Sequence, residues 1–487
     1  MLFSSMTFIY LFLPIVVTIY IIVRKELRNY ILLIASLIFY AWGEPKYLSI
    51  MLLTILANYF FAIFIEYSKN TQLNVFFYSK KSLYSSIIKF RTSILLFIAL
   101  FIDLGILAYF KYFNFLIDNI NLLFHSNVDF IKVIMPIGIS FYTFQAISYL
   151  IDVYRGGEEA QKDLFKLSLF IALFPQLIAG PIVKYHEISY QINDRHIDFQ
   201  KISYGIKRFI IGLSKKMLIA NAFGQVADKI FSQNADSFSP GIAWLGAIAY
   251  TIQIYFDFSG YSDMAIGLGS IFGFTFPENF NYPYISKSIS EFWRRWHISL
   301  STWFKEYLYI PMGGNRKGNF RTYINLGIVF LATGFWHGAA WNFIIWGVWN
   351  GFFVILEKVF NINSKSNKSP LSSFCLHFYC IIVFVVGWVL FRSPDLSYAL
   401  KYIANMFGLV SHSHNKYALI YYMDTIEWIT LPVAIFFCLP FAKNLLELSC
   451  KNNAISWGTN IICFILFLLS SSYVAASTYN PFIYFRF

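Results

Sequence analysis

Two histidines stand out in this sequence as residues that could perform acid–base chemistry, His297 and His337. Both lie in the stretch from Asn279 to Asn350, which also holds seven of the twelve tryptophans of the 487-residue chain. Histidine titrates near neutral pH, so it can take a proton from a hydroxyl group and return it later in the same reaction. Its ring can also act as a nucleophile. Either property would let such a residue take part directly in a reaction.

The first of these histidines sits in a segment that is predicted to form one helix from Ser288 to Pro311. Ser288 and Glu291 have the spacing of a capping box, in which each side chain satisfies a free amide at a helix start. Because a helix in contact with lipid would not carry charges such as Arg294 and Arg295, this helix is expected at a membrane interface or beside a polar cavity. Behind the cap, an aromatic stripe recurs at helical spacing, formed by Phe292, Trp293, Trp296, Trp303, Phe304 and Tyr307.

His337 lies at the junction of two apolar segments, Tyr323 to Trp336 and Asn342 to Leu356. The small residues from Gly338 to Ala340 follow it and leave room for another group beside the imidazole. Polar groups at membrane depth cost free energy unless they are used or paired, so the position is a candidate functional site. The alternative is a histidine that bonds a backbone carbonyl and only joins two helices.

Composition alone indicates an integral membrane protein. Hydrophobic residues make up 58% of the chain and charged residues 13%, whereas a soluble domain carries about twice that charged fraction. The net charge is +13, with Lys and Arg clustered between apolar runs. That pattern favours membrane topology and attraction to anionic lipids, and it argues against nucleic acid as a partner. Seven Lys or Arg between Lys287 and Arg321 predict that this segment faces the cytoplasm.

The apolar runs predict an all-α, polytopic helical bundle. Many are shorter than the ~20 residues needed to cross a bilayer, which indicates tilted, broken or re-entrant helices. The expected fold has about 11–13 transmembrane or re-entrant helices around a central tunnel. It forms one membrane domain, with peripheral helices in 1–132, a motif-bearing core in 133–356 and further helices in 357–487. The run from Leu167 to Val183, which contains Pro175, is the best re-entrant candidate.

Several other motifs do not carry chemistry. The glycine-rich segment from Gly313 to Gly318 lacks the ending of a phosphate-binding loop and is expected to be a turn. The pair His412 and His414 has no further ligand at metal-binding spacing, and no CxxC pair or GxSxG elbow occurs. Neither a metal nor a bound cofactor is therefore expected.

Five sequence blocks resemble the membrane-bound O-acyltransferase family, in the branch of the alginate O-acetylation membrane protein and the peptidoglycan O-acetyltransferases of Gram-negative bacteria. In family order, they are Leu173 to Ile188, Ile252 to Gly269, Glu291 to Arg316, Gly334 to Gly347 and Asn480 to Phe487. The resemblance implies that His337 is essential for catalysis and that His297 is the second characteristic histidine. It also implies a bacterial inner-membrane enzyme that uses acetyl-CoA as a cytoplasmic donor. A separate periplasmic acetyltransferase or acceptor protein would be its partner.

The resulting hypothesis makes His337 the general base for O-acetylation of an envelope polysaccharide, with His297 in an orienting or assisting role. An acyl-histidine intermediate is the alternative mechanism. A transporter or flippase with proton-relay histidines is the alternative function. Arginine suits the phosphates of coenzyme A, although positive-inside anchoring is an equally good explanation of the two arginines. The expected substrate- or donor-binding residues are Arg294, Arg295, Trp296, Trp336, Asn342 and Asp257.

The role of Asp257 is open, because it and Asp263 interrupt an apolar stretch. Their carboxylates could cap the ends of a broken helix, or Asp257 could bind polar groups of the donor.

Overall fold

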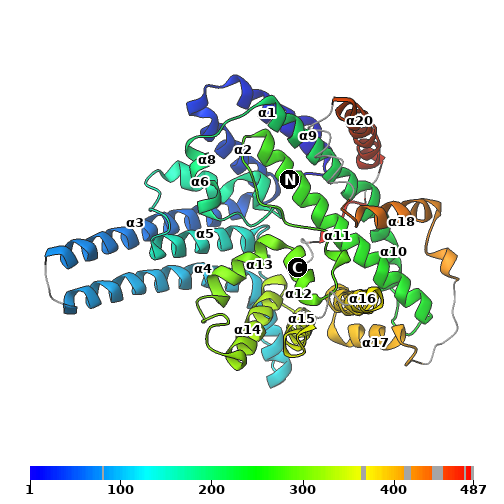
Figure 1. The fold of residues 1–487 in the computed structure, drawn as a ribbon. Coiled ribbons are helices and arrows are strands. Elements are labelled where there is room, and N and C mark those ends of the chain that lie inside the picture. The colour runs from blue at the N-terminus through cyan, green and yellow to red at the C-terminus, as the bar shows by residue number, and fades with distance from the viewer. Residues whose placement is uncertain (79–81, 363–368, 411–417, 441–452, 477–478, 484–487) are drawn as a thin grey trace. The chain divides into compact units, whose positions relative to one another are not determined.

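All regular secondary structure in the described part of the chain is helical, which confirms the predicted all-α class (Figure 1). The computed structural model describes residues 1–78, 82–362, 369–410, 418–440, 453–476 and 479–483. The chain forms two compact units: residues 1–205 with 268–277, and residues 206–267 with 278–487. Both histidines lie in the second unit. The division into 1–132, 133–356 and 357–487 stays a prediction.

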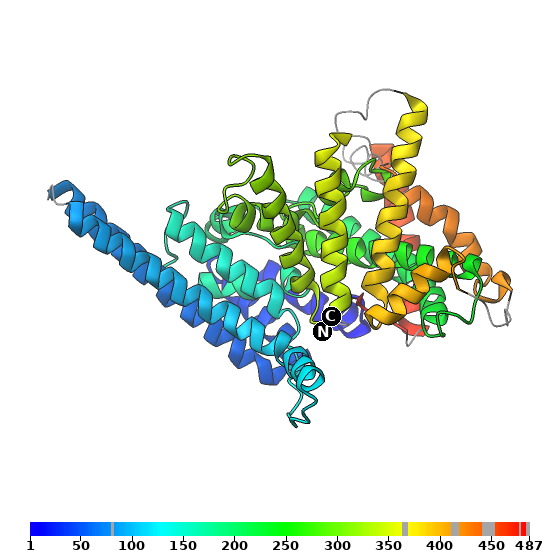
Figure 2. The same ribbon diagram turned by 90° about the horizontal axis from the view of Figure 1, so that it is seen from below.

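The first unit is built around two long helices, α3 and α4, which lie side by side (Figure 2). α5 packs against both of them, and α6 packs against α2 and α3. The helices of this unit are α1 (Leu13–Ile22), α2 (Arg28–Gly43), α3 (Leu48–Tyr78), α4 (Ser82–Phe124), α5 (Ile139–Arg155), α6 (Leu164–Ala172), α7 (Phe174–Leu177) and α8 (Tyr185–Asn193).

The apolar run from Leu167 to Val183 is broken, as the sequence predicts. α6 ends at Ala172, and Leu173 has φ −54° and ψ 111°, outside the helical region. α7 then forms a single turn with Pro175 near its start, where proline costs no hydrogen bond. The amide of Gln176 donates back to the carbonyl of Phe170 and closes the break. Whether this segment re-enters the membrane stays a prediction.

The second unit contains the helices that carry both histidines. Its strongest helix–helix contact is between α14 and α15, and α16 packs against α15 (Figure 2). It contains most of α9 (Phe199–Ser214) and of α11 (Pro240–Ile271). The others are α10 (Asn221–Phe231), α12 (Ile289–Arg295), α13 (Ile298–Phe304), α14 (Asn319–His337), α15 (Trp341–Val359), α16 (Pro370–Arg392), α17 (Leu396–Met406), α18 (Thr425–Phe437) and α20 (Asn453–Ala476).

Four described helices are long and apolar enough to cross a membrane. The spans are Pro45–Asn70, Phe90–Phe124, Pro370–Arg392 and Ser456–Ala476. Shorter apolar helices occur at Phe8–Ile22 and Thr425–Phe437, in agreement with the subspan runs seen in the sequence. The protein is therefore a helical membrane protein. The count of 11–13 helices and the central tunnel stay predictions.

The predicted single helix from Ser288 to Pro311 is wrong. It is divided into α12 and α13, followed by a π-helical turn at Lys305–Tyr309. The Ser288 cap is confirmed, since its Oγ accepts from the backbone N–H of Glu291 at 3.1 Å. The break falls at His297, whose φ of 44° and ψ of 55° are left-handed.

The pair α14 and α15 is packed through two facing glycines. A Cβ on Gly334 would lie 2.6 Å from the carbonyl oxygen of Phe343, and one on Gly347 would lie 2.5 Å from that of Phe330. Real Cβ atoms do not come this close to backbone, so only glycine permits the observed spacing. The close contact fixes the carboxyl-terminal end of α14, where His337 stands.

Candidate active site

His337 is the last residue of α14 and is 5% exposed. Its ring is surrounded edge-to-face by three aromatic rings. The centroid distances are 5.0 Å to Trp336, 4.9 Å to Trp346 and 5.2 Å to Phe391. Edge-to-face contacts of this kind fix the plane of a ring and exclude water from its faces.

His297 is fully buried and has both polar and aromatic contacts. Its Nδ1 lies 3.1 Å from Oδ1 of Asn279. On its apolar side, Phe258 lies 4.7 Å away, edge-to-face, and Trp336 lies 5.9 Å away between centroids. The structure therefore brings both histidines against the same indole, that of Trp336.

A pocket of about 660 Å³ opens in the same unit, between α12, α13, α14 and α15. It reaches Ile298, which follows His297, and Thr333, which lies one turn before His337. Its other lining includes Trp293, Leu300, Phe304, Val329, Phe330 and Val354. The pocket thus has an apolar wall close to the segments that hold both histidines.

Three cationic side chains lie around this pocket, from Arg294, Lys305 and Lys358. Arg294 and Lys305 are exposed, and Lys358 is half-buried. Glu357 also borders the pocket, but it is fully buried and accepts the backbone N–H groups at the start of α12. The accessible charge at the pocket is consequently positive, which suits an anionic ligand.

The structure separates the two neighbouring arginines that the sequence placed together. Arg294 is exposed on the pocket. Arg295 instead donates from Nε to Glu291 at 2.9 Å and from Nη1 to the carbonyl of Asn281 at 3.0 Å. Its guanidinium holds α12 to the segment before it, so Arg294 is the better placed of the two for a ligand. The donor-binding role of both residues stays a prediction.

Trp296 and Asn342 occupy buried positions near the histidines. Trp296 stacks on Phe292 and lies 4.8 Å from Trp388 between centroids. Asn342 donates from Nδ2 to the carbonyl of Ser393 at 2.9 Å. Its Oδ1 is buried and has no hydrogen-bond partner within the described residues. Trp296 is therefore packed in an aromatic cluster with Phe292 and Trp388, whereas Trp336 is the indole that contacts both histidines. Asn342 keeps one hydrogen-bond acceptor without a partner within the described residues.

Asp257 forms a buried ion pair with Lys216, 2.6 Å long, between side chains that are 1% and 3% exposed. Its other oxygen accepts from the backbone N–H of Ile483 at 2.9 Å, and the carbonyl of Pro481 accepts from Lys216. The interpretation of a broken, carboxylate-capped helix is wrong, because α11 is continuous through Asp257 and Asp263. The acids are needed there to balance cations that face this helix.

Sequence reasoning missed three residues that shape the site. Asn279 contacts His297, Glu357 caps α12, and Lys216 balances Asp257. Glu357 and Lys216 had a visible signal, because a charge beside a long apolar run needs a partner. The turn at Gly313 and Gly314 is present as expected, with φ of 103° and 56°. The histidines at 412 and 414 lie outside the described residues.

No three His, Cys, Asp or Glu side chains among the described residues gather closely enough to hold a metal ion. The polar atoms around His297 and His337 are nitrogen and oxygen atoms suited to hydrogen bonding and proton transfer. The arrangement can bind an anionic ligand beside two buried imidazoles.

Comparison with known proteins gives consistent matches along the chain. The sequence profile of the membrane-bound O-acyltransferase (MBOAT) family matches residues 161–391, a range that includes both histidines. The chain is 39% identical to a probable alginate O-acetylase AlgI of Pseudomonas putida over the whole length of both proteins. It is 34% identical to a peptidoglycan O-acetyltransferase of Helicobacter pylori, over all of this chain and 98% of that protein. A teichoic acid D-alanyltransferase of Bacillus subtilis is 32% identical over 48% of this chain and 60% of its own length.

Proposed function

This chain belongs to the membrane-bound O-acyltransferase family and is an O-acyltransferase, and we propose that it moves acetyl from cytoplasmic acetyl-CoA across the bacterial inner membrane. The acetyl group serves O-acetylation of a cell-envelope polysaccharide. Two relatives support this substrate class, since one is a probable alginate O-acetylase and the other a peptidoglycan O-acetyltransferase.

The observation that carries the proposal is the pairing of two buried imidazoles with an adjoining positive pocket. His297 and His337 both contact Trp336, and the pocket reaches Ile298, next to His297, and Thr333, one turn before His337. A transporter site would need polar groups along a path, whereas acyl transfer needs a base and a bound thioester at one place. Two imidazoles beside one pocket suit acyl transfer better than transport.

In the proposed reaction, His337 takes the proton of the acceptor hydroxyl as general base. The hydroxyl oxygen then attacks the thioester carbonyl and forms a tetrahedral oxyanion. The oxyanion collapses, the carbon–sulfur bond breaks, and the thiolate accepts the proton from the imidazolium of His337. Donor and acceptor exchange one acetyl group and one proton, so no cofactor is required. Enclosure by Trp336, Trp346 and Phe391 supports this role, since excluding water prevents hydrolysis of the donor.

We assign the donor phosphates to the positive side chains at the pocket, Arg294, Lys305 and Lys358. Arginine and lysine bind phosphate through charge-assisted hydrogen bonds. The apolar wall of the pocket suits the uncharged arm that carries the thioester.

The acceptor side requires a partner in this proposal. The polysaccharide of the envelope lies beyond the inner membrane, so a separate periplasmic acetyltransferase or acceptor protein would receive the acetyl group. Anionic lipids are the other expected partner, because the chain carries a net charge of +13.

A deletion strain tests the proposal directly. Ester-linked acetate is measured in purified peptidoglycan and in exopolysaccharide, before and after complementation with the wild-type gene. Loss of acetate from one polymer and its return on complementation would support the proposal and identify the polymer. Unchanged acetate in every polymer, with the protein present in the wild-type membrane, would contradict it.

A topology measurement tests the direction of transfer. In a cysteine-free background, a cysteine at Asn319 should resist an impermeant thiol reagent in intact cells and react after lysis. The reason is the positive charge of the segment from Lys287 to Arg321, since basic loops stay in the cytoplasm. Labelling in intact cells would place donor entry on the periplasmic side.

A further inference from the structure

Asn279 lies at the centre of the polar contacts that surround His297. It is fully buried, and its backbone carbonyl accepts from the N–H of Ile298 at 2.9 Å. Its Oδ1 lies 3.1 Å from His297 Nδ1, 3.2 Å from the backbone N of Ser299 and 2.9 Å from Ser299 Oγ. Its Nδ2 donates to Oγ of Ser262 at 3.0 Å. Every polar group of this side chain is therefore engaged.

These contacts define which ring nitrogen of His297 carries the proton. The backbone N–H of Ser299 can only donate, so the amide atom that faces it must be the oxygen of Asn279. That oxygen can only accept, so Nδ1 of His297 is its donor at 3.1 Å. The hydroxyl of Ser299 also lies 3.5 Å from Nδ1, but it donates its one proton to the same amide oxygen at 2.9 Å. A neutral imidazole with its proton on Nδ1 has its lone pair on Nε2. The surroundings of Asn279 thus select one tautomer of the histidine.

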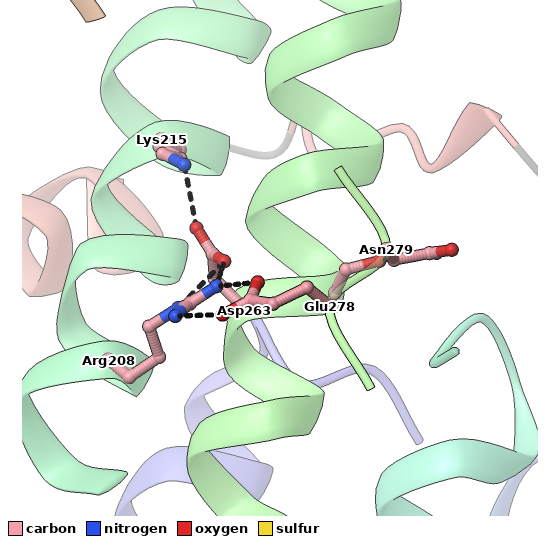
Figure 3. A network of polar contacts seen from close by, with 6 residues as sticks. Arg208, Lys215, Asp263, Glu278 and Asn279 are labelled. Atoms are coloured by element: carbon pink, nitrogen blue, oxygen red, sulfur yellow. Dashed lines mark hydrogen bonds and ion pairs between the residues drawn. The ribbon is translucent and has the colours of Figure 1, made fainter. Parts of the chain in front are cut away.

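The residue before Asn279, Glu278, is held by an ion cluster (Figure 3). Arg208 donates two hydrogen bonds to the carboxylate of Glu278, of 3.0 and 2.7 Å. Arg208 and Lys215 also bind Asp263, at 2.6 Å each. Figure 3 shows the side chains of Glu278 and Asn279 leaving the backbone in opposite directions. The cluster therefore anchors the residue that precedes Asn279, while Asn279 itself reaches His297.

A small polar cavity of about 60 Å³ borders this segment. Its lining includes Arg208, Asp263, Glu278, Asn279 and Ser262. Because the charged groups are already paired with one another, the cavity presents hydrogen-bonding groups without a net charge. Asn279 is the neutral residue through which this network contacts the histidine.

The backbone at His297 is unusual in a way that fits this anchoring. A left-handed conformation is uncommon for residues other than glycine and costs of order 1 kcal/mol or more. His297 adopts it at the break between α12 and α13. The bonds from Asn279 to Ile298 and Ser299 hold the chain in that conformation.

We propose that Asn279 is a positioning residue for acetyl transfer, which holds His297 in the Nδ1–H tautomer and so makes Nε2 a hydrogen-bond acceptor toward the bound substrates, while the proton of the acceptor hydroxyl goes to His337. The inference rests on the proposed function, and it adds a residue and a protonation state to it. His297 in the other tautomer would present an N–H at Nε2 and could not accept a hydrogen bond there.

The test compares two replacements of Asn279. Asn279→Asp keeps an oxygen that accepts from Nδ1–H and from Ser299, and the hydroxyl of Ser262 can turn to donate. Asn279→Leu keeps the approximate volume and removes the acceptor. Per folded protein, Asn279→Leu should lower kcat for acetyl transfer about tenfold or more with little change in the donor KM, since positioning acts on the reacting geometry. Asn279→Asp should retain most of the activity.

Asn405 provides a matched control. It is also fully buried in the second unit, and its Nδ2 donates to the carbonyls of Ala235 and Phe238 at 2.7 and 2.8 Å. Asn405→Leu and Asn405→Asp should reduce the amount of folded protein, and the Asp variant should be the worse, because a carboxylate would face carbonyl oxygens. Neither should change kcat per folded protein, measured on the monodisperse fraction.

The titration of the His297 ring gives a readout that a purely structural role would not move. Burial lowers the pKa of His297 to about 3, so the acidic limb of kcat/KM reports the base His337 and not His297. A carboxylate beside Nδ1 stabilises the imidazolium, so the pKa of His297 should rise in Asn279→Asp, measured from the pH dependence of its ¹⁵N signal. An unchanged titration of His297 in Asn279→Asp, with equal loss of activity in the Asp and Leu variants, would overturn the inference.

The tautomer can also be observed without activity. In protein with ¹⁵N-labelled histidine, the His297 signal is identified by its loss in His297→Gln. It should show a protonated Nδ1 in the wild type and a mixture of tautomers in Asn279→Leu. A protonated Nε2 in the wild type would overturn the inference even if transfer is robust. Absence of acetyl transfer by the wild type, alongside the expected tautomer, would count against the proposed function alone.

Discussion

His297 and His337 contact the same indole, yet their surroundings hold them in different ways. His297 is fixed through a ring nitrogen by Asn279, at a left-handed break between two short helices. His337 is fixed through its ring faces and edges by Trp336, Trp346 and Phe391, at the end of a regular helix. One histidine is oriented by polar contacts and the other by aromatic packing.

The difference separates two requirements of proton transfer. A polar contact on Nδ1 selects a tautomer, but it commits that nitrogen to the contact. Aromatic walls orient a ring through its faces and edges, and they exclude water. Exclusion of water is what a base beside a thioester needs, which supports the assignment of His337 as the base and of His297 as an oriented acceptor.

The largest effect should come from His337→Gln. Glutamine is polar and of similar size, so the aromatic enclosure should persist while the titratable nitrogen is lost. Acetyl transfer should fall about 100- to 10,000-fold, the usual contribution of a general base. Membrane insertion and the monodisperse size-exclusion peak should be unchanged. Largely retained transfer by well-folded His337→Gln would show that this histidine only joins two helices.

His297→Gln should be milder, with a loss of about 10- to 100-fold in kcat. Glutamine can still bond Asn279, and the packing of Phe258 and Trp336 holds the position. Both histidine variants are measured in the same membranes with labelled acetyl-CoA. A dead but well-folded His297→Gln beside an active His337→Gln would reverse the two roles.

The packing of α14 on α15 should matter to His337 more than to His297. Gly347→Ala places a Cβ 2.5 Å from the carbonyl oxygen of Phe330, so the helices must separate, at a cost of about 1–3 kcal/mol. We expect a lower thermal midpoint in detergent at a fixed scan rate and reduced transfer. Gly327→Ala on α14 is the control, since its Cβ would meet nothing within 4 Å. Equal thermal midpoints and equal transfer activities in the two variants would show that the close contact between α14 and α15 does not shape the site.

The smallest effect should separate the adjacent arginines. Arg294→Gln removes a positive charge from the pocket and should raise the KM for acetyl-CoA roughly three- to tenfold with kcat unchanged, as expected for an exposed ionic contact. Arg295→Gln breaks the pair with Glu291 and should lower stability without a KM effect. If Arg295→Gln raised the KM for acetyl-CoA and Arg294→Gln did not, the donor phosphates would have to be assigned to the face of α12 that carries Arg295.

The amino-acid sequence by itself determined the helical membrane class, the family and the two histidines. These follow from local or additive properties: apolar content, helical periodicity, and the spacing of residues within short blocks. The cap at Ser288 and the break before Pro175 were predictable for the same reason, because a cap or a proline acts on its immediate neighbours.

Only the tertiary structure decided how those residues are held. The aromatic stripe from Phe292 to Tyr307 predicted one helix. The structure instead breaks the helix at His297, where the ring contacts Asn279, eighteen residues earlier in the chain. The sequence left Asp257 open as a donor-binding residue, but in the structure its carboxylate is paired with Lys216 and accepts from the backbone N–H of Ile483. Such partners cannot be assigned from periodicity, because each contact joins segments whose separation in space depends on the fold of the whole unit. A local pattern can therefore identify a reactive residue, but the tautomer, charge balance and enclosure of that residue come from distant parts of the chain.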